Sequence, residues 1–265
     1  MRRAAALAAS LVVAGLLLTG CGPSSETPSP SASTASGDAL AGDITVFAAA
    51  SLTGTFTEIA DAFEDAHPGV HVTLNFAGSS ALVTQLTEGA PADVFASADE
   101  ANMTKAQDAG LIDGDPEIFA SNTLEIAVPP GNPAGIGSFD DLARPGLRLV
   151  VCAPQVPCGA ATREVAELAG VTLTPVSEEN AVTDVLGKVA AGEADAGVVY
   201  RTDVIAAGDS VEGVEFPESD FVINRYPIAV LAGSSAPDVA AAFATFVRGP
   251  SGREILDASG FGDDR

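Results

Sequence analysis

Two serines stand where a strand pattern gives way to a helix pattern. Ser51 follows strand-like residues 43–49 and occupies the place of an N-cap before a helix over residues 52–66. Ser79 repeats the arrangement in front of a helix over residues 80–89. A helix N-terminus exposes backbone N–H groups that have no partner within the helix, and a hydroxyl adds another donor. Such a point binds an anion without a positive side chain, so the two serines predict an oxyanion receptor.

Two further helix starts follow later in the chain. The loop over residues 155–162 contains Cys158 and leads into a helix over 161–169. Residues 180–183 open another helix, expected over 180–191. Ligands of open α/β sheets bind beyond the carboxyl ends of the strands, where the following helices begin. The four helix starts are therefore expected to converge on one cleft.

Strand and helix patterns alternate through the part of the chain that follows residue 42. The predicted strands cover residues 43–49, 70–76, 92–97, 122–128, 147–152, 171–176, 195–200 and 221–231. The predicted helices cover residues 52–66, 80–89, 98–109, 161–169, 180–191 and 236–248. This alternation predicts the α/β class with largely parallel sheets. About 220 residues are more than one small sheet with its helices holds, so two lobes are expected.

The charge balance excludes some classes of protein. The chain has 36 acidic and 12 basic residues, with a formal net charge of −24. Nucleic acid is therefore not expected as a partner. An exported serine hydrolase is a poor alternative, because the chain has no Gly-x-Ser-x-Gly motif and its only histidines are His67 and His71. We therefore expect a binding protein and not an enzyme, with no bound metal cation; an anion must be held locally by neutral donors.

The beginning of the chain has the pattern of an export signal. Residues 1–20 contain Arg2 and Arg3, then an apolar run that ends in Leu-Thr-Gly before Cys21. These last residues resemble the bacterial lipobox, in which the cysteine receives lipid; the alternative is an ordinary signal peptide with an incidental cysteine. Residues 21–42 are rich in Ser, Pro and Thr and predict a flexible tether. The folded part is thus expected in the cell envelope, anchored to the outer face of the cytoplasmic membrane.

Two cysteines remain in the folded part. Cys152 and Cys158 flank a short loop that contains two prolines. In an oxidising compartment a disulfide between them is the expected outcome. Two free thiols or a metal site are the alternatives.

Five motifs in order resemble those of a known family. They are Val-Phe-Ala-Ala-Ala-Ser-Leu over 46–52, Phe-Ala-Gly-Ser-Ser over 76–80, Gly-Ala-Pro-Ala-Asp-Val-Phe-Ala-Ser-Ala-Asp over 89–99, Val-Pro-Cys-Gly over 156–159 and Gly-Val-Val-Tyr-Arg-Thr-Asp over 197–203. The chain resembles the molybdate-binding proteins of bacterial molybdate ABC transporters over nearly all of residues 43–265. The resemblance implies a type II periplasmic binding fold, two α/β lobes with a ligand cleft between them.

The resemblance also implies a set of binding residues. The oxyanion is expected to be held by the hydroxyls of Ser51, Ser79 and Tyr200 and by the backbone N–H groups of Cys158 and Val182. Cys158 departs from the family pattern, which commonly has alanine there. The implied function is capture of molybdate or tungstate outside the membrane and delivery to the permease of an ABC transporter driven by an ATPase. No cofactor is expected, and the protein is expected to be a monomer.

The extent of each lobe and an alternative ligand complete the expectations. Residues 43–122 and 228–265 are assigned to lobe I, and residues 123–227 to lobe II. Another tetrahedral oxyanion such as sulfate is the alternative ligand. Iron-binding relatives tend to have paired tyrosines, whereas Tyr200 and Tyr226 are well separated in this chain.

Overall fold

The computed structural model describes residues 40–263. The expected signal sequence, Cys21 and most of the tether lie outside these residues. The described residues belong to one compact unit, which contains two five-stranded sheets. Among the described residues, no helix has both the length and the apolar character required to cross a membrane.

The first sheet has the order β2-β1-β3-β10-β4. Its strands are β1 (Ala41–Ala49), β2 (Gly69–Ala77), β3 (Val94–Ala96), β4 (Ile112–Asn122) and β10 (Asn224–Leu231). The strands β2, β1 and β3 run parallel, while β10 is antiparallel to both β3 and β4. This sheet and the helices packed on it are the first lobe.

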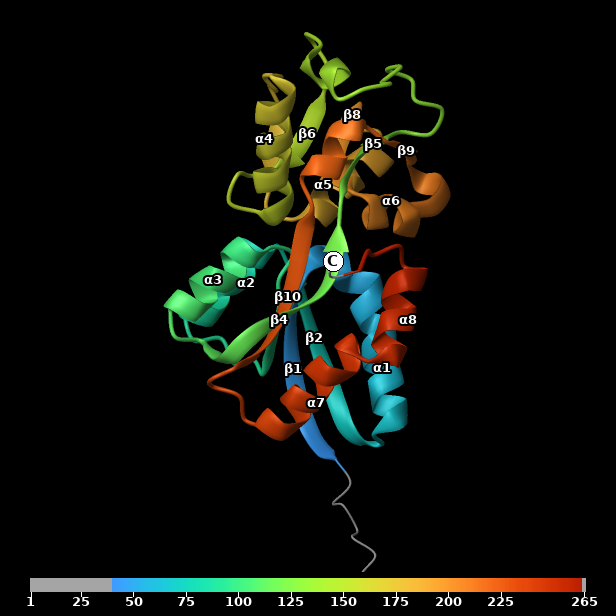
Figure 1. The fold of residues 1–265 in the computed structure, drawn as a ribbon. Coiled ribbons are helices and arrows are strands. Elements are labelled where there is room, and N and C mark those ends of the chain that lie inside the picture. The colour runs from blue at the N-terminus through green and yellow to red at the C-terminus, as the bar shows by residue number, and fades with distance from the viewer. Residues whose placement is uncertain (1–39, 264–265) are drawn as a thin grey trace, which may run out of the picture. The chain divides into compact units, whose positions relative to one another are not determined.

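Helices cover both faces of the first sheet (Figure 1). On one face lie α1 (Thr53–Ala66), α7 (Pro237–Arg248) and α8 (Pro250–Ala258), whose apolar side chains share a buried cluster with the strands. On the other lie α2 (Ser79–Thr87) and α3 (Glu100–Asp108), which bury Leu82, Leu86 and Met103. The rows of Phe and Leu at helical spacing in the sequence become these two cores.

The second sheet has the order β7-β6-β8-β5-β9 and belongs to the second lobe. Its strands are β5 (Leu124–Val128), β6 (Leu149–Cys152), β7 (Ser177–Glu179), β8 (Ala196–Tyr200) and β9 (Glu212–Val214). The helices α4 (Pro157–Ala169), α5 (Val182–Ala190) and α6 (Arg201–Ala207) complete this lobe. Its core consists mainly of Val, Leu, Ala and Ile.

The chain crosses between the sheets after β4 and again before β10. Residues 224–227, which the sequence assigned to lobe II, pair with β4 as the first part of β10. The remaining lobe boundaries stay a prediction.

Most predicted elements are present, and the errors have physical causes. The predicted strand over 171–176 is wrong: Pro175 cannot donate a ladder hydrogen bond, and the strand β7 follows it. Val171 and Leu173 instead pack on the core of the second lobe without strand pairing. The sequence analysis missed β4, a polar edge strand that contains Pro116, and it missed the short helix α6, the helix α8 and the short strand β9.

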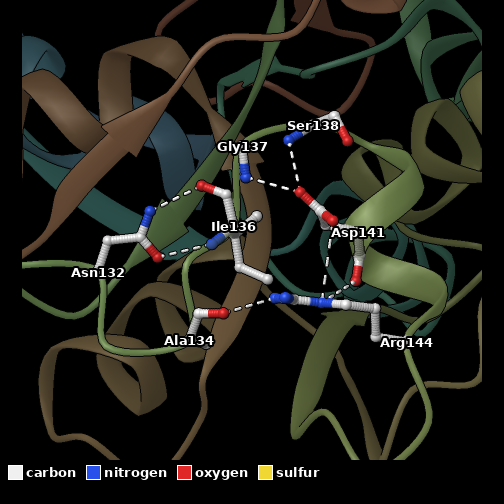
Figure 2. A network of polar contacts seen from close by, with 7 residues as sticks. All are labelled: Asn132, Ala134, Ile136, Gly137, Ser138, Asp141 and Arg144. Atoms are coloured by element: carbon white, nitrogen blue, oxygen red, sulfur yellow. Dashed lines mark hydrogen bonds and ion pairs between the residues drawn. The ribbon is translucent and has the colours of Figure 1, made fainter.

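The long connection between β5 and β6 is held by its own polar contacts (Figure 2). The side-chain amide of Asn132 donates to the Ile136 carbonyl at 2.7 Å, and its oxygen accepts from the Ile136 N–H at 2.9 Å. The carboxylate of Asp141 accepts from the N–H groups of Gly137 and Ser138 at 2.8 and 3.1 Å. The Gly137 bond in particular lowers the pKa of Asp141. The loop therefore has a defined conformation without belonging to either sheet.

Candidate functional site

Both predicted serines lie at the carboxyl ends of neighbouring strands of the first sheet. Ser51 follows β1 in a single 3-10 turn, Ala50–Leu52, and is half-buried. Ser79 is the first residue of α2 after β2 and is fully buried. Because β1 and β2 are parallel and adjacent, the two serines lie at the same edge of the sheet.

The prediction that Ser51 is the N-cap of α1 is wrong. The helix α1 begins at Thr53 and its N-cap position is Leu52, without a side-chain cap. The Ser51 hydroxyl instead lies 3.0 Å from the hydroxyl of Tyr226 on β10. The side chain is therefore directed by a tertiary contact and not by its own helix.

Ser79 is held by a backbone donor. The N–H of Ala98 donates to the Ser79 Oγ at 3.0 Å. With its oxygen used as an acceptor in this way, the hydroxyl proton of Ser79 remains for another partner. The neighbouring Ser80 is more exposed and does not line the cavity described below.

In the second lobe, two of the predicted site residues lie at helix N-termini. Val182 is the first residue of α5, and Cys158 is the second residue of α4. The first four N–H groups of an α-helix have no intrahelical carbonyl partner. The helix α4 begins earlier than the sequence predicted, because Pro157 fits the first helical position, where no N–H is needed. Cys158 thus lies inside the helix and not in the loop before it.

A disulfide joins Cys158 to Cys152 at the end of β6, with 5.7 Å between the Cα atoms. Gly159 follows at a close approach: a Cβ there would lie 2.1 Å from the Ala153 carbonyl oxygen. The disulfide links the first turn of α4 to the end of β6. Gly159 lets this turn lie close against the loop that precedes it.

Tyr200 ends β8 and is 1% exposed. Its hydroxyl has no hydrogen-bond partner among the described residues. Burial raises the pKa of this phenol well above its usual value, so it remains a neutral donor. A buried hydroxyl without a partner is costly, and such a group marks a point where a ligand oxygen is accommodated.

All five predicted residues line one small cavity. Its volume is about 10 Å³. The lining residues are Ala49, Ala50, Ser51, Gly78, Ser79, Ala98, Val156, Pro157, Cys158, Val182 and Tyr200. They come from both lobes, and none has a charged side chain.

The two lobes touch beside this cavity. A Cβ on Gly78 would lie 2.0 Å from the carbonyl oxygen of Asn180, which precedes α5. Only glycine allows the turns before α2 and α5 to approach this closely. A ligand bound in the cavity is therefore enclosed by protein.

A larger hollow, about 560 Å³, lies in the second lobe outside this site. Its lining includes Glu125, Glu215 and Asp220, with Arg201 as the only cation. Three carboxyl groups around one guanidinium make a poor environment for an anion. Size alone therefore does not identify the anion site.

The acidic residues near the motifs have structural contacts. Asp99 accepts from the N–H of Asn102 at 2.8 Å and caps α3. Asp93 accepts from the Thr45 N–H and the Ser234 hydroxyl, both at 2.7 Å. Asp203 accepts from the N–H of Tyr200 at 2.9 Å, and burial raises its pKa to about 7. None of the three lines the cavity.

The two tyrosines are closer than their sequence separation suggested. Their ring centroids are 6.0 Å apart, so the expectation of well-separated tyrosines is wrong. Burial raises the pKa of both phenols, whereas ferric iron binds the phenolate form. Among the described residues, no cluster of three His, Cys, Asp or Glu side chains suits a metal ion. Tyr226 was not predicted as a neighbour of the site, because its contact with Ser51 joins residues 175 positions apart.

Comparison with known proteins agrees with this architecture. Residues 44–262 match the family described as bacterial extracellular solute-binding protein. The molybdate-binding protein ModA of Mycobacterium tuberculosis (strain ATCC 25618 / H37Rv) is 51% identical over 255 residues, which cover 96% of this chain and 95% of the relative. The ModA protein of Escherichia coli (strain K12) is 36% identical over 237 residues, or 85% of this chain and 91% of the relative.

A solved structure shares the fold. The periplasmic molybdate-binding protein of Azotobacter vinelandii superposes with a TM-score of 0.72 at 24% identity, covering 82% of this chain and 98% of that chain. The fold is that of two-lobed periplasmic binding proteins, and the family match and the relatives are solute-binding proteins and not enzymes. The chain belongs to the family of bacterial extracellular solute-binding proteins, and the fold class expected from the sequence is confirmed.

Proposed function

We propose that this protein captures molybdate or tungstate outside the cytoplasmic membrane. One observation carries the proposal: a single cavity is lined from both lobes by the five residues whose hydroxyl or N–H groups are neutral donors. The names of the relatives in M. tuberculosis and E. coli support molybdate as the ligand. The five donor residues are Ser51, Ser79, Cys158, Val182 and Tyr200.

The donors are strong enough for this task. A hydrogen bond to a charged group contributes roughly 1.5–3 kcal/mol, and exclusion of water strengthens the electrostatic part. The Tyr200 hydroxyl makes no hydrogen bond of ordinary geometry among the described residues and is available for such a bond. Binding therefore does not require a lysine or arginine in the cavity.

The same lining disfavours phosphate. Phosphate keeps a proton at neutral pH and needs a buried acceptor for it, and no carboxylate lines the cavity. Sulfate has the same charge and shape as molybdate in a smaller radius. It is the alternative ligand, to be separated from molybdate by the competition measurement below.

Titration calorimetry with molybdate, tungstate, sulfate and phosphate tests the proposal. Molybdate and tungstate are expected to bind, with sulfate weaker and phosphate silent. Ser51→Ala should weaken molybdate binding roughly 10- to 100-fold, while Ser80→Ala, outside the cavity, should leave it unchanged. Equal losses in both variants, or equal binding of all four anions, would contradict the assignment.

We further propose that the loaded protein docks on the permease of an ABC transporter, with an ATPase on the cytoplasmic side. Residues 1–20 serve as its export signal, lipid on Cys21 anchors it and residues 21–42 act as the tether. In this proposal it works as a monomer. Cys21→Ser is expected to release the protein from the membrane fraction without changing molybdate affinity, and retention of the variant would rule out the anchor.

A further inference from the structure

Tyr226 lies behind the anion site and does not line it. Its side chain is fully buried. Its ring packs edge-on against Phe119, Phe261 and Tyr200, with centroid distances of 6.2, 5.5 and 6.0 Å. The hydroxyl is therefore held at a fixed point, 3.0 Å from the Ser51 Oγ.

The direction of the Ser51–Tyr226 hydrogen bond follows from the third partner, Asn122. The Asn122 oxygen accepts from the Thr123 N–H at 3.0 Å, which fixes the orientation of the amide. Its nitrogen, a donor only, lies 2.8 Å from the Thr202 hydroxyl and 3.4 Å from the Tyr226 hydroxyl. With Asn122 as a donor to its oxygen, Tyr226 has its single proton available for the Ser51 oxygen at 3.0 Å.

This direction determines what Ser51 can do. A serine oxygen that accepts from Tyr226 still has its own proton to donate. Ser79 shows the same arrangement, with the Ala98 N–H as the supporting donor. Both serines are therefore set up as donors, and donation to a hydroxyl also strengthens the hydrogen bond that this hydroxyl donates.

We propose that Tyr226 is a positioning residue of the anion site, whose hydroxyl donates to Ser51 so that the serine proton points to the bound oxyanion. The inference rests on the proposed function, since it requires that Ser51 contact the anion. It also links the site to the second lobe, because Asn122 bridges Tyr226 to Thr202 on α6.

A double-mutant cycle separates this role from a merely structural one. Molybdate affinity is measured by calorimetry for the wild-type protein, Ser51→Ala, Tyr226→Phe and the double variant. Tyr226→Phe is expected to weaken binding about 3- to 10-fold in the wild-type background. In the Ser51→Ala background it should have no further effect, because the group through which it acts is gone.

The outcomes distinguish the two proposals. If Ser51→Ala alone leaves affinity unchanged, the proposed anion site is wrong. If Ser51→Ala weakens binding but Tyr226→Phe does not, or if Tyr226→Phe costs the same factor in both backgrounds, the positioning role is wrong. Thermal unfolding of the ligand-free variants shows whether each is folded.

A second variant keeps the test available should Tyr226→Phe fail to fold. Asn122→Ala leaves Tyr226 in place but removes the donor that directs its proton. It is expected to give a smaller loss of affinity, again only when Ser51 is present. An equal loss of molybdate affinity when Asn122→Ala is combined with Ser51→Ala would overturn the inference.

Discussion

The two lobes supply the proposed donors in different ways. The first lobe presents two side-chain hydroxyls, Ser51 and Ser79, each directed by another group. The second lobe presents the helix N-termini at Cys158 and Val182, whose amides can only donate, and the Tyr200 phenol. A hydroxyl either donates or accepts and must be oriented, whereas a backbone amide at a helix start is a donor by construction. Substitution of a group that orients Ser51 or Ser79 can therefore weaken the donors of the first lobe. The amide donors of the second lobe can be removed mainly by changing the backbone.

The largest effect is expected at Tyr200. Tyr200→Phe removes the hydroxyl that has no partner in the described structure. Molybdate affinity should fall roughly 10- to 100-fold, because a bond to a charged group is lost. The ligand-free protein should become more stable by about 1 kcal/mol, since an unsatisfied buried group is removed.

Calorimetry and thermal unfolding with and without molybdate measure both changes. Ser51→Ala is the matched comparison, because its hydroxyl is already partnered and no gain in stability is expected. Loss of stability in ligand-free Tyr200→Phe would show that the hydroxyl has a partner within the protein.

The amide of Val182 can be removed without breaking its helix. Val182 is the first residue of α5, where proline is tolerated, and the preceding Ala181 has extended backbone geometry that suits it. Val182→Pro is expected to weaken molybdate binding about 10-fold by deleting one N–H. Val182→Ala, which keeps the N–H, is the control and should bind nearly as well as wild type; equal losses would show that the side chain matters and not the amide.

The disulfide should affect the second lobe more than the first. Replacing Cys152 and Cys158 by alanine opens a short loop, and the chain-entropy account gives a loss of about 2 kcal/mol of stability. Affinity is expected to fall only a few-fold, because the Cys158 amide remains in the first turn of α4. Urea unfolding and calorimetry of the double variant test this; a loss of affinity as large as that of Tyr200→Phe would mean that the amide depends on the bridge.

Asp203 is expected to affect stability and not molybdate affinity, and its effect appears as a pH dependence. Its pKa is raised to about 7 by burial, so the folded protein holds this proton more tightly than the unfolded chain. The contribution of the group to stability is complete below about pH 4 and is lost as the pH rises through 7. Relative to Asp203→Asn, the wild-type protein should lose stability by up to about 1.4 kcal/mol per pH unit in that window.

Urea unfolding of both proteins between pH 4 and 8 measures the difference. Asp43→Asn, at an exposed position of β1, is the control for the general effect of one fewer acid. A difference in unfolding free energy between wild type and Asp203→Asn that does not change with pH would contradict the raised pKa of Asp203.

Local patterns were enough to predict the α/β class and the helix starts near the cavity, because strand-to-helix junctions are visible in a short window of sequence. The choice of the Cys158 and Val182 N–H groups and of Tyr200 as proposed donors came from the family resemblance. Tyr226 and Asn122 were not found, because the contact between them joins residues 104 positions apart. The edge strand β4 was missed because its residues are polar and lack the alternation of a half-buried strand.

A crystal structure of the protein with bound molybdate would identify the donors themselves. The oxyanion is expected to contact the hydroxyls of Ser51, Ser79 and Tyr200 and the N–H groups of Cys158 and Val182, at donor–acceptor distances of roughly 2.7–3.2 Å. The Tyr226 hydroxyl is expected on the far side of Ser51. An anion held by lysine or arginine side chains, or bound in the larger hollow beside Glu125, would contradict the proposed site.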